Sequence, residues 1–485
     1  MAENAFVTAV LVTHDGATWL PKVIAALGSQ SRKIDRVVAV DTGSEDNSTK
    51  LLRAAGIPFF VEDRDMGYGD AIEHALELTP PITDGSQEWI WLIHDDCAPD
   101  KNALEELLRA VEDRPQVAIA GPKLRGWYDR EHLLEIGISI ANNGARWTGL
   151  ERQEQDQGQH DGVREVLAVS TAACIIRRDV YEELGGLDIN LALFRDDVDF
   201  GWRAYVAGYS AIAVPDAMAY HAEASATERR TVDVSEAFLH RPLLLDRRNA
   251  AYVMLVNSSW WLLPWVSLQL LGTSFVRAIA NLLMKLPGYA GDEIAAVALL
   301  LINPKEIIQA RRYRKKKKLI SPRIIKKFIP PRWSQFRMGS ERLVSYFSDL
   351  IRPTENSETY STQSYADIGV IGDSFDDPTL VQTKQEPLWR LIAKKPHVII
   401  FAFIAGVTLF AARNRFGEIS GGALGVSQRS GFSLLREYVD SWHAVGMGSS
   451  APVPPWLPVL GFASILTFFN LPLFITLLFL FAPMI

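Results

Sequence analysis

The sequence predicts an α/β protein: an N-terminal domain with a mostly parallel sheet and helices on both faces, followed by transmembrane helices. Two observations predict this arrangement. Short β-rich runs alternate with amphipathic segments through residues 1–125, which is typical of a parallel sheet covered on both faces. Long uncharged apolar runs then gather nearer the C-terminal end. The 485 residues are enough for about three domains.

In the first 125 residues, predicted strands alternate with predicted helices. The expected strands are 6–13, 36–40, 59–62, 89–93 and 117–120. The expected helices are 18–27, 48–55, 70–78 and 104–111. Because ligands of such sheets lie at the carboxyl ends of the strands, residues 13–15, 41–44 and 94–96 are expected on one rim.

Residues 126–245 are less regular but are expected to complete the same domain. Their pattern predicts strands at 136–140 and 166–170, helices at 178–184 and 195–207, and an edge strand at 211–215. The expected layout of the chain is therefore a domain at 1–245, a membrane-associated region at 246–310, a cytoplasmic basic segment and linker at 311–396, and a transmembrane region at 397–485.

Three apolar runs are candidates for membrane spans, since a span needs ~20 apolar residues. Residues 249–276 are 28 residues without a charge, 398–412 are a shorter run, and 444–485 are wholly uncharged, with 456–485 the most apolar part. Each run could instead be a buried core helix. Because the sequence stops inside this last apolar stretch, we interpret the chain as part of a longer polytopic protein.

The charges suggest a topology. Residues 311–327 hold ten Lys or Arg and no acid, and Arg247-Arg248 precede the first apolar run. The positive-inside rule places both basic groups in the cytoplasm. Residues 246–310 are then either a hairpin, whose return helix at 283–303 is weakened by Asp292 and Glu293, or an interfacial segment. The basic run is either a solvated juxtamembrane segment or a site for anionic lipid headgroups.

Composition excludes some classes of protein. A net charge of -7 argues against a surface that binds nucleic acid. Two cysteines, Cys97 and Cys174, cannot form a disulfide framework and favour a reducing compartment. The N-terminus has no signal-peptide pattern, so the domain is expected in the cytoplasm.

Acidic residues mark the expected rim. His94-Asp95-Asp96 follow a hydrophobic strand, and adjacent carboxylates repel one another unless a divalent cation such as Mg or Mn lies between them. Asp41, which ends the second strand, is a candidate for a ribose or base edge. Each could also simply end a strand in a turn.

A third group of acids opens the helix expected at 195–207. Asp196, Asp197 and Asp199 lie in its first turn, where the helix dipole stabilises anions, and Arg203 can pair with Asp199. One acid could serve as a general base, although a capped helix explains the pattern equally well. His221 is a lone histidine that is either structural or a ligand.

Taken together and in order, these motifs resemble the family 2 glycosyltransferases with a GT-A fold. The resemblance covers about residues 6–225, and its second half is most similar to the galactofuranosyl- and rhamnosyltransferase branches. The tail, with Trp442-His443-Ala444-Val445-Gly446, resembles large actinobacterial membrane glycosyltransferases. The matched motifs are Thr13-His14-Asp15-Gly16, Asp41-Thr42-Gly43-Ser44, Met66-Gly67-Tyr68-Gly69, His94-Asp95-Asp96, Gly185-Gly186-Leu187-Asp188, Asp196-Asp197-Val198-Asp199, Gly208-Tyr209, Pro215, Ala217 and His221.

The resemblance implies roles for individual residues. Asp197 would be the catalytic base, and Asp96, His221 and His94 would bind Mg or Mn. Asp41 would contact the nucleoside, and Asp95 would lie near the ribose or diphosphate. The residues expected to bind substrate are Thr13, Asp15, Asp41, Ser44, Gly67, Asp95, Asp196 and Trp202. Two positions depart from the family pattern, because His94 replaces an Asp of the Asp-X-Asp metal motif and Asp15 replaces an Asn.

The function implied is an inverting, metal-assisted transfer of a sugar from a nucleotide-diphosphate sugar to a hydroxyl of a cell-envelope glycan or lipid-linked acceptor. The expected partners are that donor, that acceptor and membrane lipids, with no nucleic acid, in a bacterial, multi-pass membrane protein with a cytoplasmic catalytic domain. One alternative is a nucleotidyltransferase, which would need a Gly-rich basic loop that Thr13–Trp19 lacks. Another is a non-catalytic membrane scaffold, which the His94 substitution leaves open.

Overall fold

The computed structural model describes residues 5–83, 85–151, 154–224, 242–283, 287–302, 304–331, 430–442, 450 and 456–475. The chain divides into two compact units. The first holds Met1–Tyr346 and Thr354–Thr383, and the second holds Phe347–Pro353 and Lys384–Ile485.

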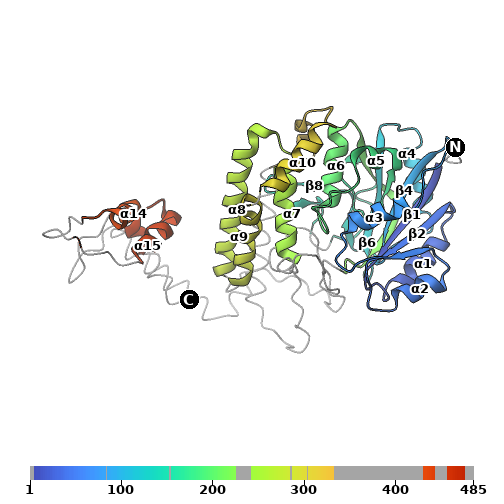
Figure 1. Ribbon diagram of the computed structural model, residues 1–485, viewed down its shortest axis with the longest axis horizontal. Coiled ribbons are helices and arrows are strands. Elements are labelled where there is room, and N and C mark those ends of the chain that lie inside the picture. Colours follow the sequence, from blue (N-terminus) through green and yellow to red (C-terminus); the bar gives the residue numbers. More distant parts are fainter. Residues whose placement is uncertain are drawn as a thin grey trace. The chain divides into compact units, whose positions relative to one another are not determined.

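A ten-stranded mixed sheet forms the centre of the first unit (Figure 1). Its main path runs β10-β12-β6-β11-β4-β1-β2-β3, with β5 paired to β12 and β7 to β6. The strands are β1 (Ala5–Thr13), β2 (Arg36–Asp41), β3 (Phe59–Val61), β4 (Gln87–His94), β5 (Cys97–Pro99), β6 (Val117–Gly126), β7 (Leu133–Glu135), β10 (Arg164–Val166), β11 (Ile175–Arg177) and β12 (Ser210–His221).

The direction of the strands agrees with the predicted sheet in its first half. β4, β1, β2 and β3 are mutually parallel, so Thr13, Asp41 and His94 end on one edge. The short strand β11 was not predicted, and it runs antiparallel between β4 and β6. The prediction of an edge strand at 211–215 was wrong, because β12 lies between β10 and β6.

The predicted strand at 136–140 is only partly present. Its end forms β8 (Ser139–Ile140), which pairs with β9 (Arg146–Trp147) in a separate two-stranded sheet. The predicted strand at 166–170 is mostly absent, because β10 covers Arg164–Val166 and ends where the predicted strand begins.

Helices cover both faces of the main sheet, as predicted. Side chains on alternate positions of β1 face opposite sides, with Val7 in one core cluster and Val10 in the other. The first cluster contains residues of α1 (Leu20–Gly28), α2 (Ser48–Ala54) and α4 (Ala103–Val111). The second contains residues of α3 (Tyr68–Glu77), α5 (Arg178–Leu184) and α6 (Asp196–Val206).

Helix α7 (Pro242–Asn257) corrects the prediction that residues 249–276 form one membrane run. Its residues 250–256 are buried, and Ala251–Val256 belong to the same core cluster as α3, α5 and α6. Residues 249–257 are therefore part of the domain core rather than of a membrane span.

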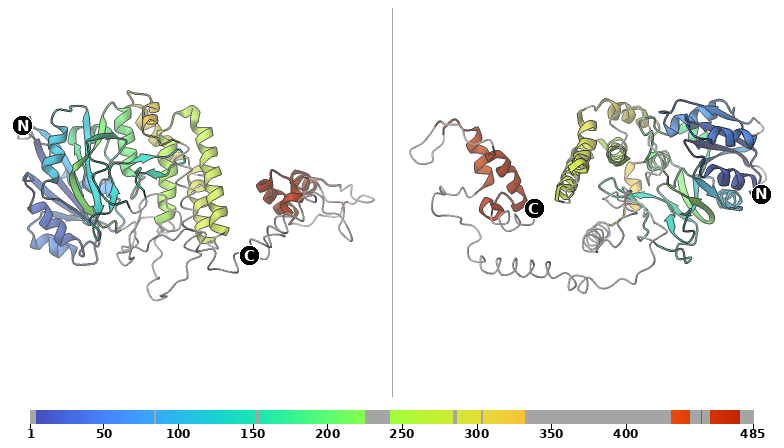
Figure 2. Two further views of the ribbon diagram at one scale, coloured as in Figure 1. Left: turned by 180° about the vertical axis from the view of Figure 1, so that it is seen from behind. Right: turned by 90° about the horizontal axis from the view of Figure 1, so that it is seen from below.

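The remainder of that run forms the 3-10 turn η3 (Trp260–Leu262) and α8 (Leu263–Leu283), which packs against α9 (Pro287–Ile302). Figures 1 and 2 show α8 and α9 side by side. Among the described residues, one helix, Trp260–Leu282, is long and apolar enough to cross a membrane, with mean hydropathy 1.3 and 22% of its apolar window buried.

The charges around α8 and α9 have structural partners. Glu293 on α9 is buried and accepts hydrogen bonds from Arg247 on α7 (2.9 Å) and Arg277 on α8 (2.7 Å). Arg248 pairs with Glu306 at 3.0 Å. Arg247 and Arg248 thus bind acids within this unit, and Glu293 stabilises the return helix by joining it to two others.

After α9 the chain forms α10 (Lys305–Lys315) and the 3-10 helix η4 (Pro322–Lys327), both within the first unit. α10 packs on α7 and η4 on α6. The first part of the basic segment is therefore folded onto the domain.

The second unit is described only in part. α14 (Gly431–Val439) packs against α15 (Leu457–Ala463), which continues into η5 (Ser464–Thr467). Phe468 and Phe469 then adopt positive φ angles, so the helix is interrupted within 456–475, and the rest of the predicted span at 456–485 lies outside the described residues. The predicted span at 398–412 lies outside the described residues.

Candidate active site

The ends of β1 and β4 are tied together by Asp95. Its buried Oδ2 accepts hydrogen bonds from Thr13 Oγ1 (3.0 Å) and from the His14 backbone amide (2.8 Å). A side chain at Gly16 would place its Cβ 2.1 Å from the same oxygen, so this approach requires glycine. Both Thr13 and Asp95 lie on the predicted rim, where they fix the loop after the first strand.

Asp15 and Ser44 join this loop to the end of β2. The Asp15 amide donates to Ser44 Oγ (2.9 Å), and the Asp15 carboxylate accepts a hydrogen bond from Arg64 (2.6 Å). Burial alone would raise the pKa of Asp15, but the hydrogen bonds from Arg64 and the Glu45 amide lower it below its usual value. Arg64, which sequence reasoning missed, thus adds a cation to the rim.

Asp41, at the end of β2, presents an unused hydrogen-bond acceptor. Its Oδ1 accepts from the Ser44 amide (2.9 Å), whereas Oδ2 is buried with no partner in the part of the chain that the structure describes. Burial raises the pKa of Asp41. A buried carboxylate oxygen without a partner is costly, so a donor from a ligand is expected there.

Three potential metal ligands lie close together near the end of β4. One ligand atom each from His94, Asp96 and His221 lies within 4.8 Å of the other two. Asp96 Oδ1 is 3.2 Å from His221 Nε2 and 4.0 Å from His94 Nδ1. The carboxylate's other oxygen accepts from the Ala224 amide (2.8 Å), which fixes its orientation.

These three residues come from two distant parts of the chain. His94 ends β4, Asp96 lies two residues further on, and His221 ends β12, which pairs with β5 at Cys97. Both cysteines are buried and free. Two imidazoles and one carboxylate form a donor set that can hold a divalent cation, although Mg²⁺ prefers oxygen ligands.

Thr171 and Tyr68 surround this cluster and were not predicted as site residues. The Tyr68 ring meets the His94 ring edge-on with centroids 4.8 Å apart. Thr171 Oγ1 lies 3.5 Å from His94 Nε2 and donates to Asp196 Oδ2 at 3.3 Å. Thr171 therefore lies between the three-ligand cluster and the start of α6.

The predicted acids lie at the N-terminus of α6. Asp196 and Asp197 are both buried. Burial and the neighbouring Asp197 carboxylate raise the pKa of Asp196 to about 7. Asp197 Oδ2 accepts a hydrogen bond from Arg146 (2.8 Å), and Arg146 also binds Glu135. Arg146 therefore fixes the position of the predicted base.

The backbone before α6 is held in an uncommon conformation. Phe194 and Arg195 have φ angles of 65° and 70°, which side chains other than glycine rarely adopt. Arg195 forms a two-point hydrogen bond to Asp246 of α7, with distances of 2.7 and 3.0 Å. This pair joins the segment that carries the two acids to a helix fifty-one residues further along the chain.

The predicted pair between Asp199 and Arg203 is present at 2.7 Å. Asp199 also binds Arg314 of α10 at 2.7 Å, so the acid holds α6 against the basic segment. Although Asp199 lies in the same turn as Asp196 and Asp197, its partners are Arg203 and Arg314, which give it a structural role.

Two predicted substrate residues are placed differently. Gly67 is the N-cap of α3, and a Cβ there would lie 3.1 Å from Ala192 Cα, so close packing explains this glycine. Trp202 is buried in the hydrophobic core, and its indole Nε1 has no partner among the described residues. No hydrogen bond of the described residues joins Gly67 or Trp202 to the three-ligand cluster.

Several known proteins are similar in sequence to this chain. Residues 22–236 match the family model described as glycosyltransferase like family 2. The chain is 24% identical over 279 residues to the N-acetylglucosaminyl-diphospho-decaprenol L-rhamnosyltransferase of Mycobacterium tuberculosis, covering 53% of this chain and 86% of that protein. It is 24% identical over 211 residues to galactofuranosyltransferase GlfT1 of Mycolicibacterium smegmatis, covering 43% and 68%.

Among solved structures, GalNAc-T7 with UDP, GalNAc and Mn²⁺ aligns with a TM-score of 0.46. The sequence identity is 12%, and the alignment covers 66% of this chain and 56% of that one.

Proposed function

Because residues 22–236 form a glycosyltransferase domain of family 2, we propose that this chain transfers a sugar, with inversion, from a nucleoside-diphosphate sugar to a hydroxyl group of a cell-envelope acceptor. The observation that carries the proposal is the convergence of His94, Asp96 and His221 on the same edge of the sheet as the unpartnered Asp41 oxygen, with Thr171 linking His94 to Asp196. An anion-rich rim with a three-ligand cluster suits a diphosphate bound together with a divalent cation.

The nucleoside end of the donor is assigned to the β1–β2 side of the rim. Asp41 Oδ2 is the acceptor for a ribose hydroxyl or a base N–H, and it needs such a donor because it is buried. Asp15, Ser44 and Arg64 hold the loop around it.

The diphosphate end is assigned to His94, Asp96 and His221. A divalent cation held there would stabilise the charge that develops on the leaving diphosphate. We propose Mn²⁺ rather than Mg²⁺ as the ion of this site, because two of its three ligands are imidazoles and Mg²⁺ prefers oxygen ligands. Thr171 and Tyr68 pack against His94 and restrict its ring, which preorganises the ligand.

Asp197 is the proposed base. It would take the proton from the acceptor hydroxyl while that oxygen attacks the anomeric carbon opposite the leaving group. Arg146 holds the carboxylate in one orientation. The acceptor is proposed to be lipid-linked, since the rhamnosyltransferase relative acts on N-acetylglucosaminyl-diphospho-decaprenol, and the chain is proposed to lie at the cytoplasmic face of a bacterial membrane.

Manganese binding tests the metal assignment. The full chain is titrated with MnCl₂, with and without uridine or thymidine diphosphate, and free Mn²⁺ is followed by electron paramagnetic resonance. His221→Ala should weaken Mn²⁺ binding at least about tenfold. The matched control is His160→Ala, because His160 pairs with Glu154 outside the cluster and its loss should leave Mn²⁺ affinity unchanged. Equal affinity in the His221→Ala variant and the wild type would contradict the assignment.

A panel of nucleotide sugars tests the reaction itself. Mn²⁺-dependent release of a nucleoside diphosphate from one donor supports a transferase. A chain that binds Mn²⁺ and nucleotide but releases no diphosphate from any donor, with cell-envelope lipid extract as the acceptor source, would indicate a binding domain instead.

A further inference from the structure

A large pocket lies at the other end of α6 from the acids Asp196 and Asp197. Its volume is ≈ 990 Å³, and α6 contributes Arg203 and Val206 to its wall. At 1.5 Å per residue, Val206 lies about 14 Å along the helix from Asp197. The pocket is therefore separate from the candidate active site.

The pocket wall is strongly basic. Seven of its lining residues are Lys or Arg, and none is Asp or Glu. Most of the cations come from α10 and the residues that follow it. They are Arg203, Arg311, Arg312, Arg314, Lys315, Lys317 and Lys318.

Only part of this charge is neutralised. Arg203 and Arg314 bind Asp199, which lies outside the wall, and Asn257 accepts from Arg314 at 2.8 Å. Arg311 donates to the backbone carbonyl oxygens of Leu255 and Val256. No ion pair among the described residues joins Arg311, Arg312, Lys315, Lys317 or Lys318 to a carboxylate. The pocket therefore carries uncompensated positive charge.

The positive charges affect one another. Burial, and then repulsion by Arg311, lowers the pKa of Lys318. Burial likewise lowers the pKa of Arg311, with a further contribution from Arg314. A bound anion would relieve this repulsion.

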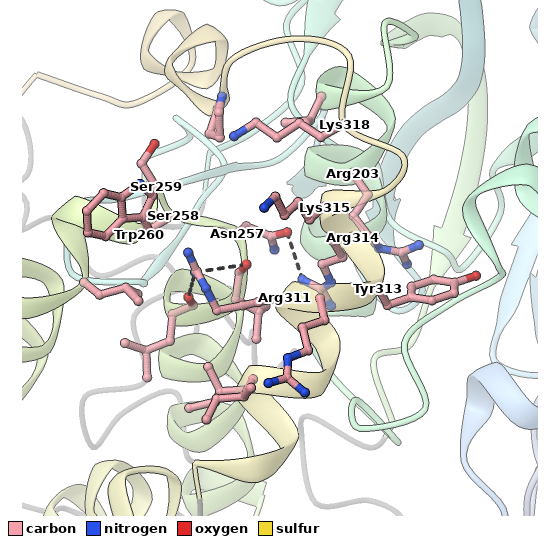
Figure 3. Close-up of a pocket in the computed structure, with 18 of the residues that line it drawn as sticks. Arg203, Asn257, Ser258, Ser259, Trp260, Arg311, Tyr313, Arg314, Lys315 and Lys318 are labelled. Atoms are coloured by element: carbon pink, nitrogen blue, oxygen red, sulfur yellow. Dashed lines mark hydrogen bonds between the residues drawn. The ribbon is translucent and has the colours of Figure 1, made fainter.

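The polar and basic groups face one another across the open space. Figure 3 shows Lys315 and Lys318 extending toward the side of the pocket that carries Ser258, Ser259 and Trp260. Ammonium groups and hydroxyl groups together are suited to binding a phosphate group.

The rest of the wall is apolar and opens onto an exposed apolar helix. Leu263 and Leu300 line the pocket, and Trp260 and Trp261 at its edge are 79% and 52% exposed. Beyond them, large apolar side chains of α8 are exposed. They are Trp265, Leu268, Leu271, Phe275, Val276 and Leu282. Tryptophan beside basic residues at the end of an apolar helix is typical of a membrane–water interface.

We propose that this pocket binds the phosphate headgroup of a membrane lipid, with the lipid's apolar chain lying along α8. The charge selects an anion, and the adjoining apolar surface selects an anion that carries a hydrocarbon chain rather than free phosphate. Two sources supply this chemistry, an anionic phospholipid of the bilayer and a polyprenyl phosphate. The inference does not depend on the proposed transferase reaction, because the pocket lies away from the candidate active site.

Binding of short-chain lipids to the full chain tests the proposal. The protein, in a neutral detergent, is titrated with dihexanoyl phosphatidylglycerol, dihexanoyl phosphatidylcholine, farnesyl phosphate and inorganic phosphate. Binding is followed by tryptophan fluorescence, since Trp260 and Trp261 line the pocket. We expect phosphatidylglycerol or farnesyl phosphate to bind at least about tenfold more tightly than phosphatidylcholine, and high salt to weaken that binding.

A triple variant locates the binding. Arg312→Gln, Lys315→Gln and Lys318→Gln together remove three pocket cations, and the Kd for phosphatidylglycerol should rise by about tenfold to 100-fold. The matched control is Lys305→Gln, Lys316→Gln and Lys326→Gln. Lys305 begins α10, and Lys316 and Lys326 belong to the basic segment; all three are exposed and do not line the pocket, so the Kd should be unchanged.

Each outcome decides between the possibilities. Preference for farnesyl phosphate over phosphatidylglycerol, or the reverse, supports the site and identifies the source of its lipid. Equal binding of phosphatidylcholine, equal binding of inorganic phosphate, or an unchanged Kd in the pocket variant would overturn the proposal. The variant should melt no lower than the wild type without lipid, because removing like charges relieves repulsion. If the variant fails to fold, two measurements on the wild type still test the proposal. They are the loss of lipid binding in high salt and the preference among the lipids.

Discussion

The Arg195–Asp246 pair gives a sharp prediction about how the acids of α6 are positioned. Both side chains are buried, with 3% and 9% of the residue exposed, and they share two hydrogen bonds. Replacing Asp246 by Asn leaves the Arg195 charge buried without its counter-charge. Removing one partner of a buried pair costs about 3–5 kcal/mol, and we expect the lower end because the amide oxygen can still accept one hydrogen bond.

This loss is large enough to measure but smaller than a typical total stability of about 5–15 kcal/mol. For a domain of this size it corresponds to a melting temperature roughly 6–12 °C lower. The free energy of unfolding is measured by urea denaturation of the full chain in detergent. The matched control is Asp216→Asn, which makes the same change at an exposed position of β12 and should have no effect.

The same variant should lose turnover. The positive φ angles of Phe194 and Arg195 cost about 1–3 kcal/mol each, and the ion pair offsets that cost. Without it the backbone relaxes, and a shift of about 1 Å at Asp196 and Asp197 is enough to reduce turnover ~100-fold. Mn²⁺ affinity should not change, because the three-ligand cluster is on other elements.

A double variant separates stability from position. Arg195→Met with Asp246→Leu removes the pair but fills its space, so stability should largely return while turnover stays low. The reasoning is refuted if Asp246→Asn unfolds within ~1 kcal/mol of the wild type and keeps its turnover.

Three further predictions follow from the site and the core. Asp197→Asn should reduce turnover by ~10²-fold with nucleotide affinity retained, and unchanged turnover would rule out Asp197 as the base. A chain that ends at residue 245 should fail to fold, because it lacks the buried face of α7. A chain that ends at residue 331 should unfold cooperatively when heated and followed by circular dichroism. Equal melting curves for the two chains would show that α7 is dispensable. Burial alone raises the pKa of Asp188, but the Arg314 charge lowers it below its usual value. The pair therefore stabilises the fold at pH values above the unfolded-state pKa of about 3.9, and this stabilisation is lost as the pH falls below that pKa. When the pH is lowered past about 4, the urea midpoint of the wild type should therefore decrease, and that of Asp188→Asn should decrease less. Equal pH dependence of the two midpoints would contradict the assignment.

The rim was predictable because its signals are local. Asp41 and His94-Asp95-Asp96 follow hydrophobic strands directly, and the alternation of strands and helices orders those strands in parallel. The i,i+4 pair of Asp199 and Arg203 was predictable for the same reason. Arg64 could have been found, since it too follows a strand, β3.

The groups that position the acids could not be predicted, because their partners are far apart in the sequence. Arg146 reaches Asp197 from a two-residue strand, and Asp246 reaches Arg195 from a helix that hydropathy assigned to the membrane-associated region. The error at residues 249–257 has a physical cause. An uncharged helix has the same composition whether protein or lipid surrounds it, and only the fold shows that the core encloses α7.

The contact between Arg195 and Asp246 also has a consequence for the order in which a newly made chain completes its fold. The ribosome releases the start of α6 well before it releases α7, so during that interval the ion pair to Asp246 cannot hold Phe194 and Arg195 in their left-handed conformation. The Arg195–Asp246 contact can form only after α7 has been made, and the apolar helix α8 follows α7 almost immediately in synthesis. This part of the proposed catalytic geometry is thus completed as the segment that we propose meets the membrane emerges.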